Sequence, residues 1–361
     1  MHIVHTESSL GWGGQEIRIL TEAAGMMRRG HVVTLLCPSQ AKIYAEAILR
    51  GVPVIGLPMA RKNIHGICVI HGWLTKNPVD VINTHSSTDS WLTALACLFL
   101  KHPPPMIRTR HISAAVSDNA ATRWLYVKAA CHVVTTGEAL REQLIRDNGY
   151  PSHHVTSIPT GVDTNHFIPG DKIRAREMVG LPRDRIIVGI VATLRSWKGH
   201  RYLMEAFAQL SDKNPRLLIV GDGPQCEALQ RQITELGLDG RVIMPGNQRD
   251  VLPWLQAMDI FVLPSYANEG VPQAAVQAML CGLPVVSTPV GGILEAIQHE
   301  QTGLIVEPGN SQQLHEAINR LLHDVPLCQT LGAAARKRAR EKFGLDTMLD
   351  KMEPLFREAM E

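Results

Sequence analysis

Two segments in the second half of the chain carry the residues best suited to chemistry. Arg195 and Lys198 lie in a loop that follows an apolar run rich in Ile and Val (186–192). Glu269 lies in a second loop, between another apolar run (260–263) and a helix-like segment. Cations at a strand's carboxyl end suit a diphosphate, whose charge needs compensation as its bond to a sugar breaks. A carboxylate accepts hydrogen bonds from sugar hydroxyls, so we expect a site for a diphosphate-linked sugar.

A helix that begins just after Glu269 would add a site for phosphate. Pro272 fits the first helical turn, where its missing N–H costs nothing, and Gly282 is suited to end the helix. The first amides of a helix have no partner within it and attract anions. We therefore predict that the ligand is lined here by Gly270, Val271, Pro272, Gln273 and Ala274.

The elements that would position these loops follow from the pattern of apolar residues. Short runs rich in Val and Ile alternate with helix-like segments along nearly the whole chain, as expected for buried parallel strands with crossover helices. The pattern predicts an α/β fold with two Rossmann-like, doubly wound domains. The predicted strands are residues 3–6, 32–37, 79–83, 106–110, 133–136, 186–192, 217–220, 242–244, 260–263, 285–287 and 304–306.

A segment punctuated by Pro and Gly (158–170) separates the two sets of strands. We place the N-terminal domain at residues 1–163 and the C-terminal domain at residues 164–344. Two such domains with their strand ends facing each other would leave a central cleft for a ligand.

Composition excludes several classes of protein. The 361 residues include 36 Lys and Arg against 34 Asp and Glu, and this net charge of +2 does not favour a nucleic-acid binder. The seven cysteines form no Cys-x-x-Cys pair, so no disulfide framework or zinc ribbon is indicated. No export signal is seen, and apolar runs such as Leu95–Leu100 are far shorter than the ~20 residues of a membrane span. We expect a soluble, cytoplasmic protein.

The first part of the chain is mildly basic. Residues 1–150 hold 15 Lys and Arg against 10 Asp and Glu, whereas residues 151–361 hold 21 against 24. This balance is compatible with an anionic acceptor, or with peripheral association at the inner-membrane surface, and equally with ordinary scatter.

The segment 264–282 resembles the signature of family 4 of the glycosyltransferases, which have the GT-B fold. That signature is a Glu, seven residues and a second Glu; Glu269 matches the first, and Gln277 occupies the second position. The resemblance implies that Glu269 holds the donor sugar and that Gln277 holds the nucleotide ribose. The amide of Gln277 can hydrogen-bond a ribose hydroxyl, but without the strength of a charged acceptor.

Other segments of the second half resemble the same family. Lys198 matches a Lys that clamps the donor diphosphate, while the usual position of the accompanying Arg holds Thr193, so we expect Arg195 to take that role. Gly223, in a Gly-Asp-Gly-Pro turn, and Gly246, in a loop that frames the nucleotide base, match further donor-binding elements.

The first half resembles the family more diffusely. The resemblance implies that Gly13 and Gly14 face the donor diphosphate and that His111 approaches the donor sugar. His85 and Ser86 follow another predicted strand and are expected to contact the acceptor. The resemblance also implies that the C-terminal helix at residues 345–361 crosses back to the first domain.

Together these features predict a retaining glycosyltransferase that moves a hexose from a nucleotide sugar, with UDP as the expected nucleotide. The expected acceptor is a bacterial surface glycan or glycolipid, such as lipopolysaccharide or an exopolysaccharide precursor. Because no Asp-x-Asp motif occurs, we expect no metal and no other cofactor, and the positive side chains would stabilise the departing diphosphate.

Three alternatives remain open from the sequence. One is a non-hydrolysing nucleotide-sugar epimerase of the same fold, which needs no acceptor. Another is a catalytically silent homologue that binds a nucleotide sugar without transferring it. Gln277 and the displaced Arg195, which depart from the family's pattern, would explain the loss of activity. The third is a dinucleotide-dependent dehydrogenase, which the missing Gly-x-Gly-x-x-Gly fingerprint disfavours.

Overall fold

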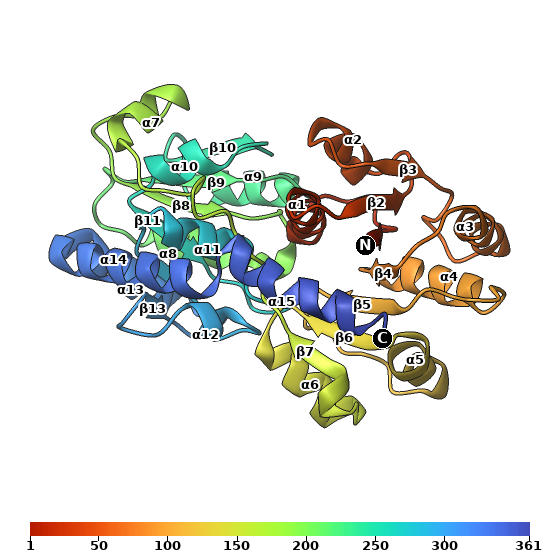
Figure 1. The fold of residues 1–361 in the computed structure, drawn as a ribbon. Coiled ribbons are helices and arrows are strands. Elements are labelled where there is room, and N and C mark those ends of the chain that lie inside the picture. The colour runs from red at the N-terminus through yellow and green to blue at the C-terminus, as the bar shows by residue number, and fades with distance from the viewer. The chain divides into compact units, whose positions relative to one another are not determined.

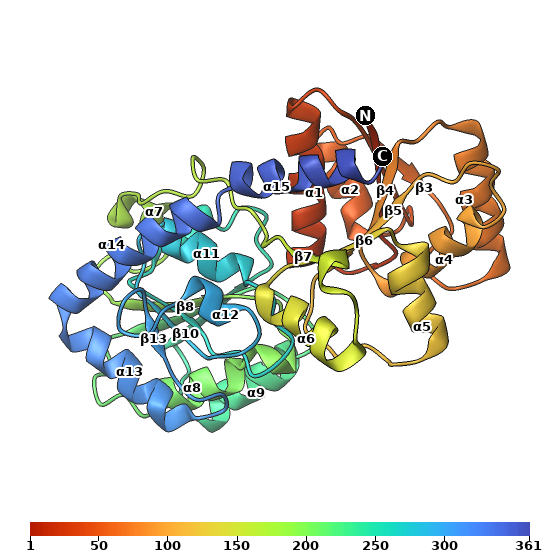
Figure 2. The ribbon, with the colours of Figure 1, turned by 60° about the horizontal axis from the view of Figure 1, so that its bottom comes forward.

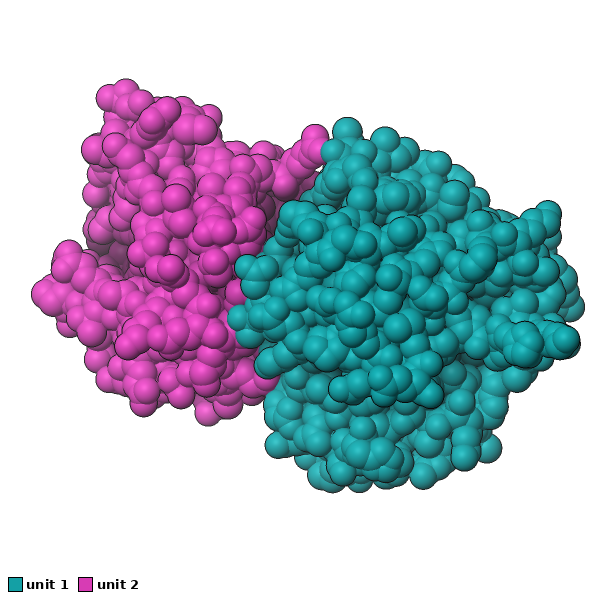
Figure 3. All heavy atoms as spheres, viewed as in Figure 1, with its two compact units in different colours: residues 1–161, 345–361 teal, residues 162–344 magenta.

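The computed structural model describes residues 1–361 and divides the chain into two compact units (Figure 3). Unit 1 comprises Met1–Gly161 and Leu345–Glu361, and unit 2 comprises Val162–Gly344. The predicted domain boundary at residue 163 lies two residues beyond the first segment of unit 1. Each unit is built around one parallel sheet with helices on its faces (Figure 1), which confirms the α/β class and the two Rossmann-like domains.

Unit 1 contains a seven-stranded sheet in the order β3-β2-β1-β4-β5-β6-β7. Its strands are β1 (His2–Thr6), β2 (Val32–Cys37), β3 (Val54–Gly56), β4 (Val81–Thr84), β5 (Met106–Arg110), β6 (His132–Thr135) and β7 (Val155–Ser157). Its helices are α1 (Gly14–Arg28), α2 (Lys42–Leu49), α3 (Ile64–Lys76), α4 (Ser87–Cys97), α5 (Ala120–Trp124), the π-helix η1 (Leu125–Ala129), α6 (Glu138–Asn148), the short η2 (Ser152–His154) and the C-terminal α15 (Leu345–Glu358).

Unit 2 contains a six-stranded sheet in the order β10-β9-β8-β11-β12-β13. Its strands are β8 (Ile187–Val191), β9 (Arg216–Val220), β10 (Val242–Gly246), β11 (Ile260–Leu263), β12 (Val285–Ser287) and β13 (Leu304–Ile305). Its helices are α7 (Lys172–Met178), the 3-10 turn η3 (Ser196–Lys198), α8 (His200–Ala208), α9 (Cys226–Glu235), α10 (Leu252–Ala257), α11 (Gln273–Leu280), α12 (Ile293–Ala296), α13 (Ser311–His323) and α14 (Val325–Lys342). Figure 2 shows α8 and α9 on one side of this sheet and α11 and α14 on the other.

The order of the strands creates one topological switch point in each sheet. The chain builds outward from β1 to β3 on one side and then returns to β4 on the other, so β1 and β4 are neighbours in unit 1. In unit 2 the same reversal makes β8 and β11 neighbours. Loops leaving the carboxyl ends of two such strands diverge, and the space between them is where open α/β sheets bind ligands.

The C-terminal helix α15 belongs to the core of unit 1, where it packs against α1 (Figure 1). Phe356 is fully buried, and a Cβ added at Gly25 of α1 would lie only 2.6 Å from a methyl carbon of Leu349. At the edge of this contact, Arg29 Nη2 lies 2.6 Å from the carboxylate of Asp350. The contact is therefore apolar at its centre and ionic at its rim. No helix of the structure is both long enough and apolar enough to cross a membrane.

We expect Phe356→Ala to lower the free energy of unfolding of unit 1 by about 3–5 kcal/mol, because it leaves a cavity beneath α15. The control is Lys351→Ala, which alters an exposed residue of the same helix and should change stability by no more than about 0.5 kcal/mol. Thermal unfolding of both variants measures the difference. Equal midpoints for the two variants would show that α15 is not part of this core.

Candidate active site

The loops at the switch point of unit 2 bring Lys198 and Glu269 together. Lys198 ends the turn η3 that follows β8, and Glu269 lies in the loop that follows β11. Lys198 Nζ lies 2.6 Å from Glu269 Oε1. Glu269 is 4% exposed and the Lys198 side chain 18% exposed, so the pair is largely removed from water. A buried carboxylate stays charged only with a cation or several hydrogen bonds beside it, and Lys198 supplies the cation.

Hydroxyl groups from neighbouring strand ends hold the Glu269 loop in place. Ser265 Oγ donates a hydrogen bond of 2.6 Å to the same Oε1 of Glu269. Thr288, just after β12, donates its hydroxyl to the carbonyl of Ser265. The second oxygen of Glu269, Oε2, receives no hydrogen bond from the chain, so it remains as an acceptor for a ligand hydroxyl.

Close backbone approaches allow the two loops to meet, and they require glycine. A Cβ at Gly199, beside Lys198, would lie 2.0 Å from the carbonyl oxygen of Pro264. A Cβ at Gly291 would lie 1.9 Å from the carbonyl oxygen of Glu269. Both glycines have positive φ angles, +76° and +56°, which side chains disfavour. The position of Glu269 therefore depends on glycines from two other loops.

The loop after β9 supports the backbone before Lys198. The amide of Leu194 donates to the carbonyl of Asp222, and a Cβ at Gly223 would lie 2.8 Å from the carbonyl oxygen of Leu194. Gly246 ends β10, and its carbonyl accepts a hydrogen bond of 2.9 Å from the amide of Gly221. Gly223 and Gly246 thus lie at the same carboxyl edge as Lys198 and Glu269.

Helix α11 begins one residue later than predicted. Pro272 is its N-cap, and Gln273 is its first residue. The first intrahelical bond runs from the amide of Val276 to the carbonyl of Pro272, so the amides of Gln273 and Ala274 have no acceptor within the helix. Gln277 is 7% exposed, and its side-chain amide makes no hydrogen bond to the chain. Glu269, Gly270 and Val271 directly precede these residues, so all the predicted donor-binding groups of this region lie in the single segment 269–277.

Arg195 is less constrained than Lys198. It is exposed, and its guanidinium lies 5.6 Å from the centre of the Trp197 ring without a carboxylate partner. The predicted pair of cations is thus present on one loop, with Lys198 engaged by Glu269 and Arg195 at the surface.

In unit 1, the predicted glycines begin the helix that follows β1. Gly13 is the N-cap of α1, and Gly14 is its first residue. The loop before them is anchored by the fully buried Glu7, whose Oε1 accepts from the amide of Ser9 and whose Oε2 accepts from the side chain of Gln15. Burial, together with nearby carboxylates, raises the pKa of Glu7 to about 8.

The structure places His85 and Ser86, which are predicted to contact the acceptor, in hydrogen-bond networks of unit 1, and their acceptor role stays a prediction. His85 is 3% exposed, and its two ring nitrogens contact His5 and His111. Ser86 caps α4 by exchanging hydrogen bonds with Asp89. Both residues are therefore used within unit 1. His111 directly follows β5, is partly buried, and has Nδ1 without a partner in the chain.

Sequence reasoning missed the residues that support the site from behind. These are Ser265, Thr288, Glu7 and His5. Three of them could have been suspected, because Glu7, Ser265 and Thr288 each follow a predicted apolar strand within two residues. His5 lies inside β1, where a histidine next to apolar residues gives no signal of its own.

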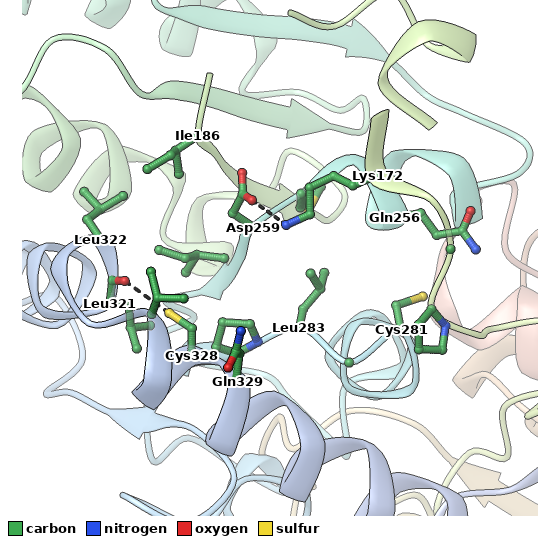
Figure 4. A pocket seen from close by; sticks show the side chains of 17 residues that line it. Lys172, Ile186, Gln256, Asp259, Cys281, Leu283, Leu321, Leu322, Cys328 and Gln329 are labelled. Carbon is green, nitrogen blue, oxygen red and sulfur yellow. Dashed lines mark hydrogen bonds and ion pairs between the residues drawn. The ribbon is translucent and has the colours of Figure 1, made fainter. Parts of the chain in front are cut away.

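A separate cavity of about 310 Å³ lies in unit 2 (Figure 4). Its lining includes Ile186, Asp259 and Leu283, which precede or begin β8, β11 and β12. Because parallel strands share their amino ends, the cavity lies at the edge opposite to Lys198 and Glu269. None of the predicted site residues lines it.

The comparisons with known proteins agree with this architecture. The family model for "Glycosyltransferase Family 4" matches residues 12–166, and the model for "Glycosyl transferases group 1" matches residues 171–338. An uncharacterised glycosyltransferase of Methanocaldococcus jannaschii is 26% identical over 97% of this chain and 95% of its own length. The D-inositol 3-phosphate glycosyltransferase of Streptomyces bingchenggensis is 28% identical over 82% of this chain and 70% of its own.

Among solved structures, the Anabaena protein HepE in complex with UDP-glucose superposes with a TM-score of 0.89 at 23% identity, over 99% of this chain and 100% of that one. The two Rossmann-like units are those of a GT-B glycosyltransferase. Specifically, the chain belongs to glycosyltransferase family 4, with a group 1 domain in its second half. The dehydrogenase alternative is thereby overturned.

We expect Gly291→Ala to be less stable than Gly240→Ala by about 2 kcal/mol. Both glycines have positive φ, but a Cβ at Gly240 meets no atom within 4 Å, whereas one at Gly291 strikes the Glu269 carbonyl. Because both alanines would be strained by a positive φ, that strain cancels when the two variants are compared. The remaining difference in stability comes from the steric contact at Gly291. Chemical denaturation measures the difference. Equal stabilities would mean that the Gly291 loop does not press on Glu269.

Glu7 should make the stability of unit 1 depend on pH. Its pKa is about 8 in the folded protein and ordinarily 4.5, so its contribution is fully present below 4.5 and is lost as the pH rises through about 8. We therefore expect Glu7→Gln to gain thermal stability relative to the parent as the pH is raised from about 5 to about 8. A parallel Glu358→Gln control at the exposed C-terminus should show no such trend. A flat difference for Glu7→Gln would contradict the raised pKa.

Proposed function

We propose that this protein is a retaining glycosyltransferase that transfers a hexose from a UDP-sugar to a hydroxyl group of a glycan or glycolipid. The observation that carries the proposal is the largely buried Lys198–Glu269 pair at the switch point of unit 2. It offers a cation to a diphosphate and a free carboxylate oxygen to a sugar hydroxyl. UDP-glucose is the donor tested first, because HepE is described in complex with it.

Donor binding would use the whole segment from Glu269 to Gln277. Glu269 Oε2 accepts a hydrogen bond from a hydroxyl of the hexose, and the amides at the start of α11 face the diphosphate. The side-chain amide of Gln277, which has no partner in the chain, hydrogen-bonds the ribose. Gly223 and Gly246 leave room for the nucleotide at the ends of β9 and β10.

The chemical step breaks the bond between C1 of the hexose and the β-phosphate oxygen. The electron pair of that bond leaves with UDP, where Lys198 and Arg195 stabilise the developing negative charge. The acceptor hydroxyl attacks C1 on the same face, and its proton passes to an oxygen of the departing phosphate. The side chains themselves provide the compensating charge, so this scheme requires no metal ion. His111 of unit 1 contributes a hydrogen bond to a hydroxyl of the bound sugar.

The kind of acceptor is inferred from the charge of the first part of the chain. Residues 1–150 carry a small excess of basic side chains, which is compatible with an anionic acceptor. A bacterial surface glycolipid fits this description, and association with the inner-membrane surface would bring the enzyme to it. A small acceptor such as D-inositol 3-phosphate, named for one relative, is equally anionic and belongs in the same panel.

The first experiment is a thermal-shift screen against UDP-, GDP- and ADP-sugars, followed by transfer assays with lipid-linked and small acceptors. A ligand present at about 100 times its Kd adds roughly 2.7 kcal/mol to stability. We expect UDP-sugars to give the largest shift and an acceptor to accelerate UDP release. Formation of a new UDP-sugar isomer without any acceptor would indicate an epimerase. Binding without release or transfer would indicate a silent homologue.

We expect Lys198→Ala to lower kcat/KM by roughly 30- to 1,000-fold, because it removes about 2–4 kcal/mol of stabilisation of the leaving diphosphate. The control is Lys172→Ala, since Lys172 also pairs with a carboxylate, Asp259, but lies beside the separate cavity. It should leave kcat/KM unchanged.

A double variant, Lys198→Ala with Glu269→Gln, removes both charges and separates chemistry from folding. We expect it to be more stable than Lys198→Ala alone, because no unpaired carboxylate is buried, while turnover stays low. Parental kcat in Lys198→Ala would refute the assignment of Lys198.

A further inference from the structure

Three imidazoles form a hydrogen-bonded row at the carboxyl edge of the unit 1 sheet. His5 Nδ1 lies 2.9 Å from His85 Nε2, and His85 Nδ1 lies 3.0 Å from His111 Nε2. Ring centres are 5.2 Å apart in each neighbouring pair. These nitrogen separations are those of direct hydrogen bonds and leave no room for an ion between the rings. We call His5, His85 and His111 the histidine row.

The strands at the switch point of unit 1 hold the row. His5 lies in β1 and pairs in register with Asn83 of β4. His85 is two residues beyond Asn83 and therefore lies on the same face, because side chains alternate along a strand. His111 directly follows β5, the next strand of the sheet. The row thus crosses three neighbouring strands, and each ring is fixed by a rigid element.

The surroundings keep the row neutral. Burial, reinforced by the Arg18 guanidinium, lowers the pKa of His5 to about 3. Burial also holds the pKa values of His85 and His111 well below the usual range, with further lowering by Arg18 and Arg108. Each ring therefore has one N–H and one bare nitrogen near pH 7.

A neutral row allows two arrangements of its protons. In the first, His5 donates to His85, His85 donates to His111, and His111 carries its own proton on Nδ1. In the second, every hydrogen bond is reversed, and His5 carries its proton on Nε2. The two arrangements differ in which group is left at each end of the row.

The buried end of the row decides between them. His5 Nε2 is buried and has no partner in the chain. A buried N–H without an acceptor is rare and costly, and a bare nitrogen is the milder case. The positive charge of Arg18 near His5 also favours a lone pair over an N–H. The first arrangement is therefore favoured, and it places a proton on Nδ1 of His111, the one nitrogen of that ring without a partner.

We propose that His85, which is hydrogen-bonded to His5, is a positioning residue that holds His111 in its Nδ1–H tautomer, so that His111 always donates, and never accepts, the hydrogen bond to a bound sugar. The ligand class is a sugar whose oxygen accepts that bond. This inference rests on the proposed function, because it assigns the partner of His111 to the substrate.

The tautomer has a consequence for recognition. A row that fixes Nδ1–H offers a donor whose direction and protonation do not change when substrate arrives, so no reorganisation is needed at that moment. In the opposite tautomer, the same nitrogen would present a lone pair to the sugar.

The matched variants are His85→Asn and His85→Phe. The Asn side-chain amide lies close to the position of Nδ1 in histidine and keeps a donor to Nε2 of His111, although it loses the ring. Phe keeps a ring that can pack against His5 and His111 but has no donor. A merely structural His85 would be better replaced by Phe, whereas a positioning His85 would be better replaced by Asn.

The direct readout is the ¹⁵N NMR spectrum of histidine-labelled protein, with the His111 signals assigned by comparison with His111→Gln. We expect Nδ1 of His111 to be protonated and Nε2 bare in the parent and in His85→Asn. In His85→Phe, the signals should shift towards the Nε2–H tautomer that free histidine prefers in water. A protonated Nε2 in the parent, or an unchanged His111 spectrum in His85→Phe, would overturn the proposal.

Turnover of UDP-glucose provides the second readout. We expect kcat/KM to fall about tenfold in His85→Phe, because part of the population then holds the wrong tautomer, and to be largely recovered in His85→Asn. The reverse ranking would overturn the positioning role. If the parent turns over no UDP-sugar, the proposed function fails, and the NMR result still decides the tautomer of His111.

Discussion

A carboxylate that is almost fully buried stays ionised only with a cation or several hydrogen bonds beside it, and this requirement organises the site of unit 2. Glu269 is 4% exposed, and Lys198 balances it across a 2.6 Å contact between the loops after β8 and β11. The contact forms only because Gly199 and Gly291 let the backbones approach closely. An incoming diphosphate is a second anion for the same lysine, so the pair is poised to exchange one partner for another.

The same topology appears in both units and places polar groups at both switch points. In unit 2, the neighbours β8 and β11 end in loops that carry Lys198 and Glu269. In unit 1, the neighbours β1 and β4 lead to Glu7 and His85. Glu7 anchors the glycine loop before α1, and His85 connects His5 to His111. Each unit therefore combines an apolar parallel sheet with a small, buried polar cluster at one edge.

The features that could be predicted from the sequence are those that depend on a local pattern of residues. The six strands of unit 2 are built on short runs rich in Val, Ile and Leu, and the loops after two of them carry Lys198 and Glu269. The sequence pattern missed β3 and β7, because these edge strands have three residues each and are only partly buried. It also gave no sign that His85 is buried between two other imidazoles, since the neighbours of a residue in space are not known from the sequence. The contact between His5 and His85 joins residues 80 positions apart, which no local pattern reveals.

The most direct test of this account is a crystal structure of the protein with UDP-glucose bound. We predict diphosphate oxygens within hydrogen-bond distance, about 3 Å, of Lys198 Nζ, and a hexose hydroxyl on Glu269 Oε2. A nucleotide bound elsewhere, for example in the cavity beside Lys172, with the Lys198–Glu269 contact unaltered, would contradict it.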